Sequence, residues 1–311
     1  MNLCEHLRQK SIESIFKMKT MQDVWPTWQK HINKLTGGAP YSAGDILDLG
    51  DHLSEIFTST GESGRNQSSL AGGGAAWEGL VCWYMNLCLL GSRAVVIKQS
   101  KSLVPDPIAH SATVKYNNFK SNTESDLIGI IFPDRNEYTC NLEELRSFIT
   151  LQGNPAYKNS EINYKPLIND LVDRDFNALE VSVIQCKTNW NDNAQIPMLW
   201  DMIYRTKEFI DTGIAVGDKS YSIRDLSRFS YCFVTVPSNK KDKFKPTSTS
   251  VQRVRSLSGG NYWGKASEDA VAQNVSEIFT RNYSTASSKG LRTDLSVALK
   301  TVTKGCSYFR L

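Results

Sequence analysis

The segment ALEVSVIQCKTNWND, residues 178–192, places two polar side chains at the end of a stretch that otherwise reads as a buried strand. Because side chains on a strand alternate between its two faces, Gln185 and Lys187 share one face with Val181 and Val183. Burying a carboxamide and an ammonium without polar partners is costly. A face that begins with valines and ends in Gln185 and Lys187 therefore predicts a polar site at this end of the strand.

Two acidic residues could complete that site. Asp126 immediately precedes the apolar run LIGIIF, so its carboxylate lies where Gln185 and Lys187 emerge if the two strands are neighbours. Glu78 interrupts the apolar helical segment AAWEGLVCWYMNLCLLG, where a carboxylate needs a cation or a metal as its partner. Carboxylate and amide oxygens suit a hard cation such as Mg²⁺, and a neighbouring lysine can orient a water beside a phosphate. The combination indicates phosphodiester hydrolysis.

These motifs, DLIGIIF, VIQCK and AAWEGLVCWYMNL, resemble those of the PD-(D/E)XK nuclease superfamily, in the Gln-x-Lys variant found in Mrr-type and some other restriction endonucleases. The resemblance covers about residues 75–205. It implies a restriction-endonuclease-like α/β core, with a central mixed sheet flanked by helices. It also implies a Mg²⁺-dependent, site-specific endonuclease of double-stranded DNA, like the Type II restriction enzymes. Asp126 and Gln185 would then be the metal ligands, Lys187 the catalytic lysine and Glu78 an accessory acid.

This chain departs from the usual motif in two ways. Gln185 stands where an acid is usual, which removes one negative charge and leaves the number of metal ions open. The literal Pro-Asp dipeptides place Asp106 and Asp134 elsewhere, and either acid could replace Asp126. We expect Asp126 because it opens a strand, whereas Asp106 lies between two prolines and Asp134 follows a strand.

Each of these residues also has a simpler interpretation, in which it has no catalytic role. Gln185 could be satisfied within the fold, Lys187 could be solvated at a strand end, and Glu78 could belong to a structural ion pair. Two further functions remain open: a DNA repair or recombination nuclease with the same fold, and a non-catalytic DNA-binding module.

The elements that must position these residues follow from periodicity. Apolar spacing near 3.6 predicts helices over residues 11–25, 42–57, 75–91, 141–152, 193–211 and 267–283, and short apolar runs predict strands over residues 93–99, 111–118, 126–132, 178–187 and 231–237. Residues 59–74 are rich in Gly and Ser and predict a loop. We expect an N-terminal helical region over residues 1–58, a nuclease core over residues 59–237 and a basic C-terminal region over residues 238–311 within the same domain.

The basic region predicts DNA contacts. Residues 239–265 carry a net charge of +6, which exceeds the +4 of the whole chain. Lys240 and Lys241 suit phosphate contacts. Arg253 and Arg255 lie in a run with Val251 and Val254 that we interpret as strand-like, and arginine can bind guanine edges. Asn189, in the polar run after the Gln-x-Lys strand, is a further candidate.

Composition bounds the remaining possibilities. The chain has 311 residues and seven cysteines, of which no two form a Cys-x-x-Cys pair, so we expect a reducing cytoplasm rather than a disulfide framework. Its four histidines form no zinc-binding pair, which disfavours zinc hydrolases and HNH nucleases. The longest apolar stretch is shorter than a membrane span, so we expect no membrane partner. A homodimer is expected by analogy with enzymes that cut palindromic DNA.

Overall fold

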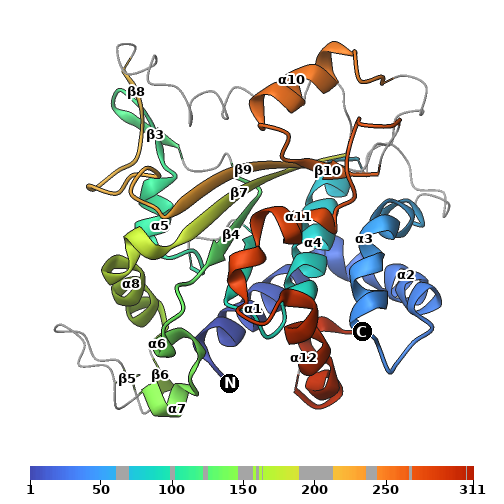
Figure 1. The fold of residues 1–311 in the computed structure, drawn as a ribbon, viewed down its shortest axis with the longest axis horizontal. Coiled ribbons are helices and arrows are strands. Elements are labelled where there is room, and N and C mark those ends of the chain that lie inside the picture. The colour runs from blue at the N-terminus through green and yellow to red at the C-terminus, as the bar shows by residue number, and fades with distance from the viewer. Residues whose placement is uncertain are drawn as a thin grey trace.

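Five strands form a central mixed sheet in the order β1-β4-β7-β9-β10 (Figure 1). The computed structural model describes residues 1–60, 70–98, 102–121, 125–145, 157–158, 161–162, 164–188, 213–235, 244–265, 268–305 and 307–311. The strands are β1 (Ala94–Lys98), β4 (Leu127–Ile131), β7 (Glu180–Lys187), β9 (Arg228–Thr235) and β10 (Tyr262–Gly264). β4 pairs antiparallel with both β1 and β7, whereas β9 pairs parallel with β7 and β10.

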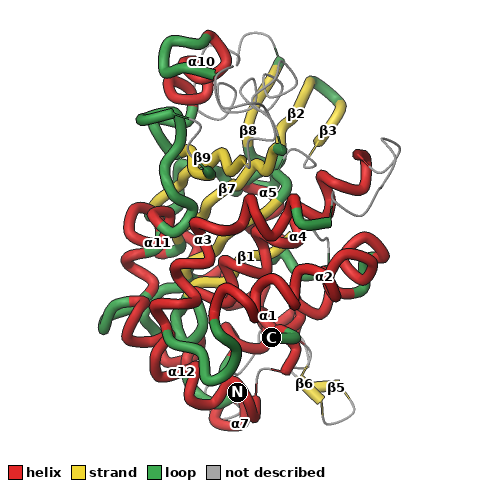
Figure 2. Tube along the Cα trace, turned by 90° about the vertical axis from the view of Figure 1, so that its right-hand side faces the viewer, coloured by secondary structure: helices red, strands yellow, loops and turns green. Residues whose placement is uncertain are grey.

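Helices cover both faces of this sheet, as the sequence predicted (Figures 1 and 2). Ile184 and Cys186 of β7 join the core beneath α4 (Leu70–Cys88), together with the N-terminal and C-terminal helices. Val181 and Val183 point the other way, into the core beneath α5 (Asp106–Ser111) and α8 (Tyr164–Arg174). The predicted alternation along this strand is therefore confirmed.

Three N-terminal helices precede α4, namely α1 (Leu3–Phe16), α2 (Lys19–Thr36) and α3 (Ala43–Thr58). Asn2 and Ser42 cap α1 and α3 by accepting hydrogen bonds from the backbone of Glu5 and Asp45. The single apolar pattern predicted over residues 11–25 is divided between α1 and α2, because the chain leaves the helical conformation at Met18, whose ψ is 130°. The buried apolar residues of α2 and α3 and of the C-terminal half of α1 share one core with α4 and the sheet, whereas Leu3, Cys4 and Leu7 of α1 belong to the core on the other face.

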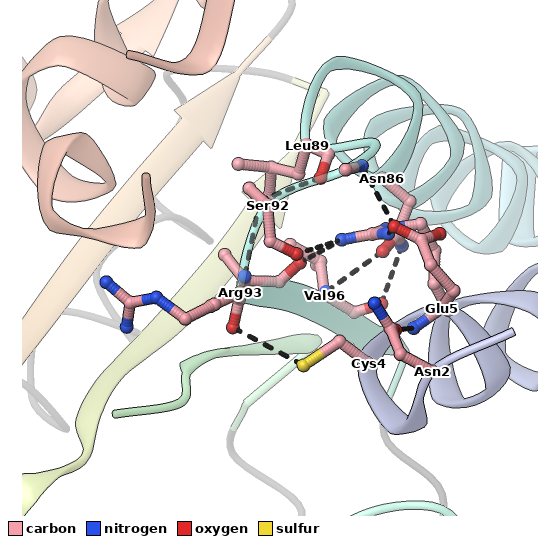
Figure 3. Close-up of polar contacts among 11 residues, drawn as sticks. Asn2, Cys4, Glu5, Asn86, Leu89, Ser92, Arg93 and Val96 are labelled. Carbon is pink, nitrogen blue, oxygen red and sulfur yellow. Dashed lines mark hydrogen bonds and ion pairs between the residues drawn. The ribbon is translucent and has the colours of Figure 1, made fainter. Parts of the chain in front are cut away.

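The edge strand β1 is completed by side chains instead of a neighbouring strand. Asn86 of α4 donates to the Val96 carbonyl at 2.6 Å, and the Val96 N–H donates back to Asn86 Oδ1 at 3.1 Å. Ser11 of α1 also donates to the Val96 carbonyl, and the buried Arg8 donates to the Ala94 carbonyl. Figure 3 shows Glu5 of α1 and Asn86 of α4 converging beside β1. Backbone groups that would otherwise be buried without partners are thus satisfied.

A smaller three-stranded sheet, in the order β3-β2-β8, stands apart from the central one and comprises β2 (Val114–Tyr116), β3 (Phe119–Ser121) and β8 (Ile214–Val216). The remaining elements are α6 (Asn136–Thr139), α7 (Leu142–Leu145), β5 (Tyr157–Lys158), β6 (Glu161–Ile162), η3 (Phe176–Ala178), α10 (Thr249–Leu257), α11 (Glu277–Asn282), η7 (Ser284–Ala286), α12 (Leu291–Gly305) and η8 (Ser307–Phe309).

Three predicted elements differ from the structure. The strand predicted over residues 111–118 is only β2, since Ser111 still belongs to α5. The predicted loop over residues 59–74 ends early, because α4 already begins at Leu70 and includes Gly72, Gly73 and Gly74. Only α11 forms within the helix predicted over residues 267–283, because residues 268–276 are turns and an isolated bridge that pairs Gln273 with Trp263. α7 lies within the helix predicted over residues 141–152. Residues 146–152 of that prediction and the whole helix predicted over residues 193–211 lie outside the described residues.

Among the helices that the structure describes, none combines the length and apolar composition that a membrane span requires.

Candidate active site

The pairing of β4 with β7 brings Asp126 to the Gln-x-Lys motif. Leu127 pairs with Ile184, so Asp126, one residue earlier, lies across from Gln185. The Asp126 carboxylate accepts a hydrogen bond of 2.7 Å from the backbone N–H of Cys186. The same oxygen, Oδ2, lies 3.9 Å from Lys187 Nζ. The neighbouring-strand arrangement on which the sequence prediction depended is therefore present.

Gln185 is buried within this strand end. Its exposed fraction is 6%, and among the described residues its carbonyl oxygen Oε1 has no hydrogen-bond partner. Leaving a buried acceptor unsatisfied costs about 1–3 kcal/mol. An orphaned carbonyl oxygen beside a carboxylate is a suitable place for a cation.

Glu78 approaches from α4, which packs against β7. Its carboxylate forms an ion pair with Lys98, the last residue of β1. Lys98 in turn pairs with Leu127 in the β1–β4 register, which places it next to Asp126. The site thus has contributions from α4 and from three consecutive strands of the sheet.

Lys98 is the residue that sequence reasoning missed. The signal was present, because AVVIK ends an apolar strand in a lysine just as VIQCK does. What the local pattern lacked was the antiparallel pairing of β1 with β4 that sets the end of β1 beside the start of β4.

Burial governs the electrostatics of the site. It raises the pKa of Asp126 from its ordinary value of 3.8 to about 6, and the nearby charge of Glu78 acts in the same direction. Lys187, the Cys186 backbone N–H and Lys98 oppose this rise. Burial and the same two carboxylates also raise the pKa of the Cys186 thiol well above its ordinary value. The Asp126 carboxylate therefore lies in a poorly solvated place, where a cation would favour its ionised form.

The oxygen atoms of Asp126 and Gln185 fit a hard cation. Mg²⁺ is commonly bound through one or two protein carboxylates while it keeps several waters. Within the part of the chain that the structure describes, no group of three or more His, Cys, Asp or Glu side chains could hold a metal ion.

The two alternative acids have other partners. Asp106 begins α5 and binds Lys165 at 2.8 Å and Asn169 at 2.7 Å. Asp134 is 72% exposed and lies 3.7 Å from Arg93. Asp126 is thus the acid that pairs with Lys187, whereas Asp106 and Asp134 pair with cations outside the Gln-x-Lys motif.

The predicted DNA contacts are placed only in part. Arg253 and Arg255 lie on helix α10, so the strand-like interpretation was wrong. Val251 and Val254 are three residues apart, which sets both on one helix face, and both are buried in a small core with Tyr262 and Phe233. Both arginines are exposed. Lys240, Lys241 and Asn189 lie outside the described residues.

Comparison with known proteins adds no family assignment, since no protein-family model and no curated protein sequence matches this chain.

Proposed function

We propose that this protein is a Mg²⁺-dependent endonuclease that hydrolyses phosphodiester bonds of double-stranded DNA at specific sites, as a Type II restriction enzyme of the PD-(D/E)XK superfamily. One observation carries the proposal. The partly buried Asp126 carboxylate, whose pKa is raised, lies against Lys187 and the Cys186 backbone on the neighbouring strand, beside the Gln185 carbonyl, which has no hydrogen-bond partner among the described residues.

Each residue has a defined task in this proposal. Asp126 and Gln185 would hold the cation through their oxygens. When bound, Mg²⁺ supplies the charge that lowers the pKa of water and neutralises the phosphate. Lys187 orients the attacking water and stabilises negative charge on the phosphate. Glu78, paired with Lys98, keeps a second carboxylate near Asp126 without adding net charge.

Exposed positive charge supports DNA as the partner. α10 presents Arg253 and Arg255 to solvent, where they can contact DNA phosphates or base edges. Two-fold symmetric DNA sites are commonly cut by two-fold symmetric enzymes, so we propose a homodimer. The described cysteines are free thiols, which fits our proposal that the protein acts in the reducing cytoplasm.

Incubation of unmodified plasmid and phage DNA with the protein and Mg²⁺ tests the proposal. We expect discrete fragments from the wild type, none in EDTA, and a loss of at least 100-fold for Lys187→Ala, since the substitution removes a charge that stabilises the transition state. Lys300→Ala, on the exposed side of α12, is the matched control and should cleave normally.

The other candidate functions give different results. A repair or recombination nuclease would produce fragments without common ends. A DNA-binding module would bind DNA in EDTA and leave every substrate intact with Mg²⁺, and Lys187→Ala would change nothing. Intact DNA from the wild type across substrates of diverse sequence and modification would contradict the proposed activity.

A further inference from the structure

The β2–β3 hairpin presents an exposed aromatic ring at its tip. Asn117 and Asn118 form the turn, with Asn117 in the left-handed region at φ 51°. Phe119 follows the turn and is 66% exposed, which makes it the most exposed large hydrophobic residue that the structure describes. It keeps contact with Tyr116, whose ring centroid lies 6.3 Å away. A phenylalanine held in this position has most of its surface available to a partner.

Positive charge lies on the opposite face of the hairpin from Phe119, because successive side chains of a strand alternate between its faces. Lys115 and Lys120 are cross-strand partners, and both form ion pairs of 2.8 Å with Asp218. The two ammonium groups hold the pKa of Asp218 well below its ordinary value. One carboxylate shared by two lysines leaves an excess of positive charge, and the exposed Lys219 adds to it. The surface therefore favours a polyanion over a neutral partner.

The hairpin also lies at the same end of the molecule as α10. Figures 1 and 2 place the three-stranded sheet and α10 at the same end, opposite α12. A duplex that contacts Arg253 and Arg255 of α10 can therefore extend toward the hairpin. The hairpin is small enough to enter DNA, because the major groove admits a two-stranded β-ribbon. Exposed apolar side chains can enter either groove.

We propose that the β2–β3 hairpin is a second DNA-contacting element, in which Phe119 on one face of the hairpin enters a groove of the duplex and Lys115 and Lys120 on the other face contact phosphates that border the groove. This inference rests on the proposed function for the identity of the polyanion, but it does not depend on catalysis.

Fluorescence anisotropy with a labelled duplex in EDTA tests it, over a series of salt concentrations. We expect Phe119→Ala to weaken binding at least fivefold, because the truncation removes the apolar contact with the groove. Lys120→Ala should lower the slope of log K against log salt by about 1, the value for one phosphate contact. Val297→Ala and Lys300→Ala are the matched controls on α12. Val297 is 62% exposed, and both controls should bind as the wild type does.

Two results would overturn the inference. The first is that Phe119→Ala and Lys120→Ala both bind DNA with the affinity and the salt dependence of the wild type. The other is a change in sedimentation for Phe119→Ala at unchanged DNA affinity, which would assign the ring to a protein contact. Single-turnover cleavage at saturating protein separates the two proposals, because hairpin variants should then cleave at the wild-type rate. If the wild type never cleaves and the hairpin variants still bind more weakly, the hairpin inference stands and the proposed activity fails.

Discussion

At the residue scale, the site is a balance of charges in a poorly solvated place. Asp126 and Glu78 face Lys98 and Lys187, so the four groups carry no net charge when all are ionised. Asp126 already has a pKa raised to about 6, in part through Glu78. A third carboxylate, at position 185, would raise the pKa of Asp126 further. Gln185 keeps an oxygen ligand at that position without this repulsion.

The titration of Asp126 predicts a pH-dependent effect on stability. Its pKa is higher in the folded chain, about 6, than its ordinary value of 3.8, so the folded state holds the proton more tightly. Stability from this group is complete below the ordinary pKa and is lost as the pH rises through about 6. In EDTA, Asp126→Asn should therefore stabilise the protein at pH 8 by on the order of 2 kcal/mol, with a smaller gain at pH 4. Thermal denaturation followed by circular dichroism measures the gain in stability at each pH. An equal gain at pH 8 and pH 4 would refute the raised pKa of Asp126.

Gln185 offers a second test, which combines substitution with metal removal. Gln185→Glu adds a charge at a position that is 6% exposed, so in EDTA at pH 8 it should lower stability by about 1–3 kcal/mol. Added Mg²⁺ should restore part of this loss, because a ligand that binds only the folded state stabilises it. Gln185→Met, similar in size but without a ligand oxygen, is the control and should gain less from Mg²⁺ than the wild type. Identical Mg²⁺ responses from all three proteins would argue against a metal at this position.

At the element scale, the position of Lys98 depends on how the edge strand β1 is held. Asn86 of α4 satisfies both backbone groups of Val96, two residues before Lys98. Asn86→Leu keeps the size of the side chain but leaves the Val96 N–H without its partner, so we expect a loss of about 1–3 kcal/mol in the free energy of unfolding. Chemical denaturation measures it. An unchanged midpoint would show that water or a shifted neighbour replaces the amide.

The same scale shows what the sequence could predict. The strands with Asp126 and with Gln185 and Lys187 were predictable because LIGII and VSVI are apolar runs with clear ends. That these two strands pair could only be assumed, since nothing in the local sequence specifies which strands are neighbours. α10 was misread because Val251 and Val254 are too few to separate a helical period from a strand. Residues 268–276 were read as helix although a bridge to β10 holds part of them.

At the scale of the whole molecule, we propose that the chemistry takes place at the central sheet and that two elements outside the sheet contact DNA. The sheet end with Asp126 and Lys187 is built from strands whose faces are buried on both sides, so the geometry of the site is fixed by the core. α10 and the β2–β3 hairpin lie at one end of the molecule, away from α12 (Figures 1 and 2). DNA affinity and bond cleavage should therefore be separable by substitution.

The most direct measurement is to sequence the ends of the DNA fragments that the wild-type protein produces with Mg²⁺, beside Lys187→Ala and an EDTA control. The account predicts that every fragment ends at the same short sequence, and that Lys187→Ala binds the same DNA but leaves it intact. Undigested DNA from the wild type, ends scattered without a common sequence, or unchanged cleavage by Lys187→Ala would contradict it.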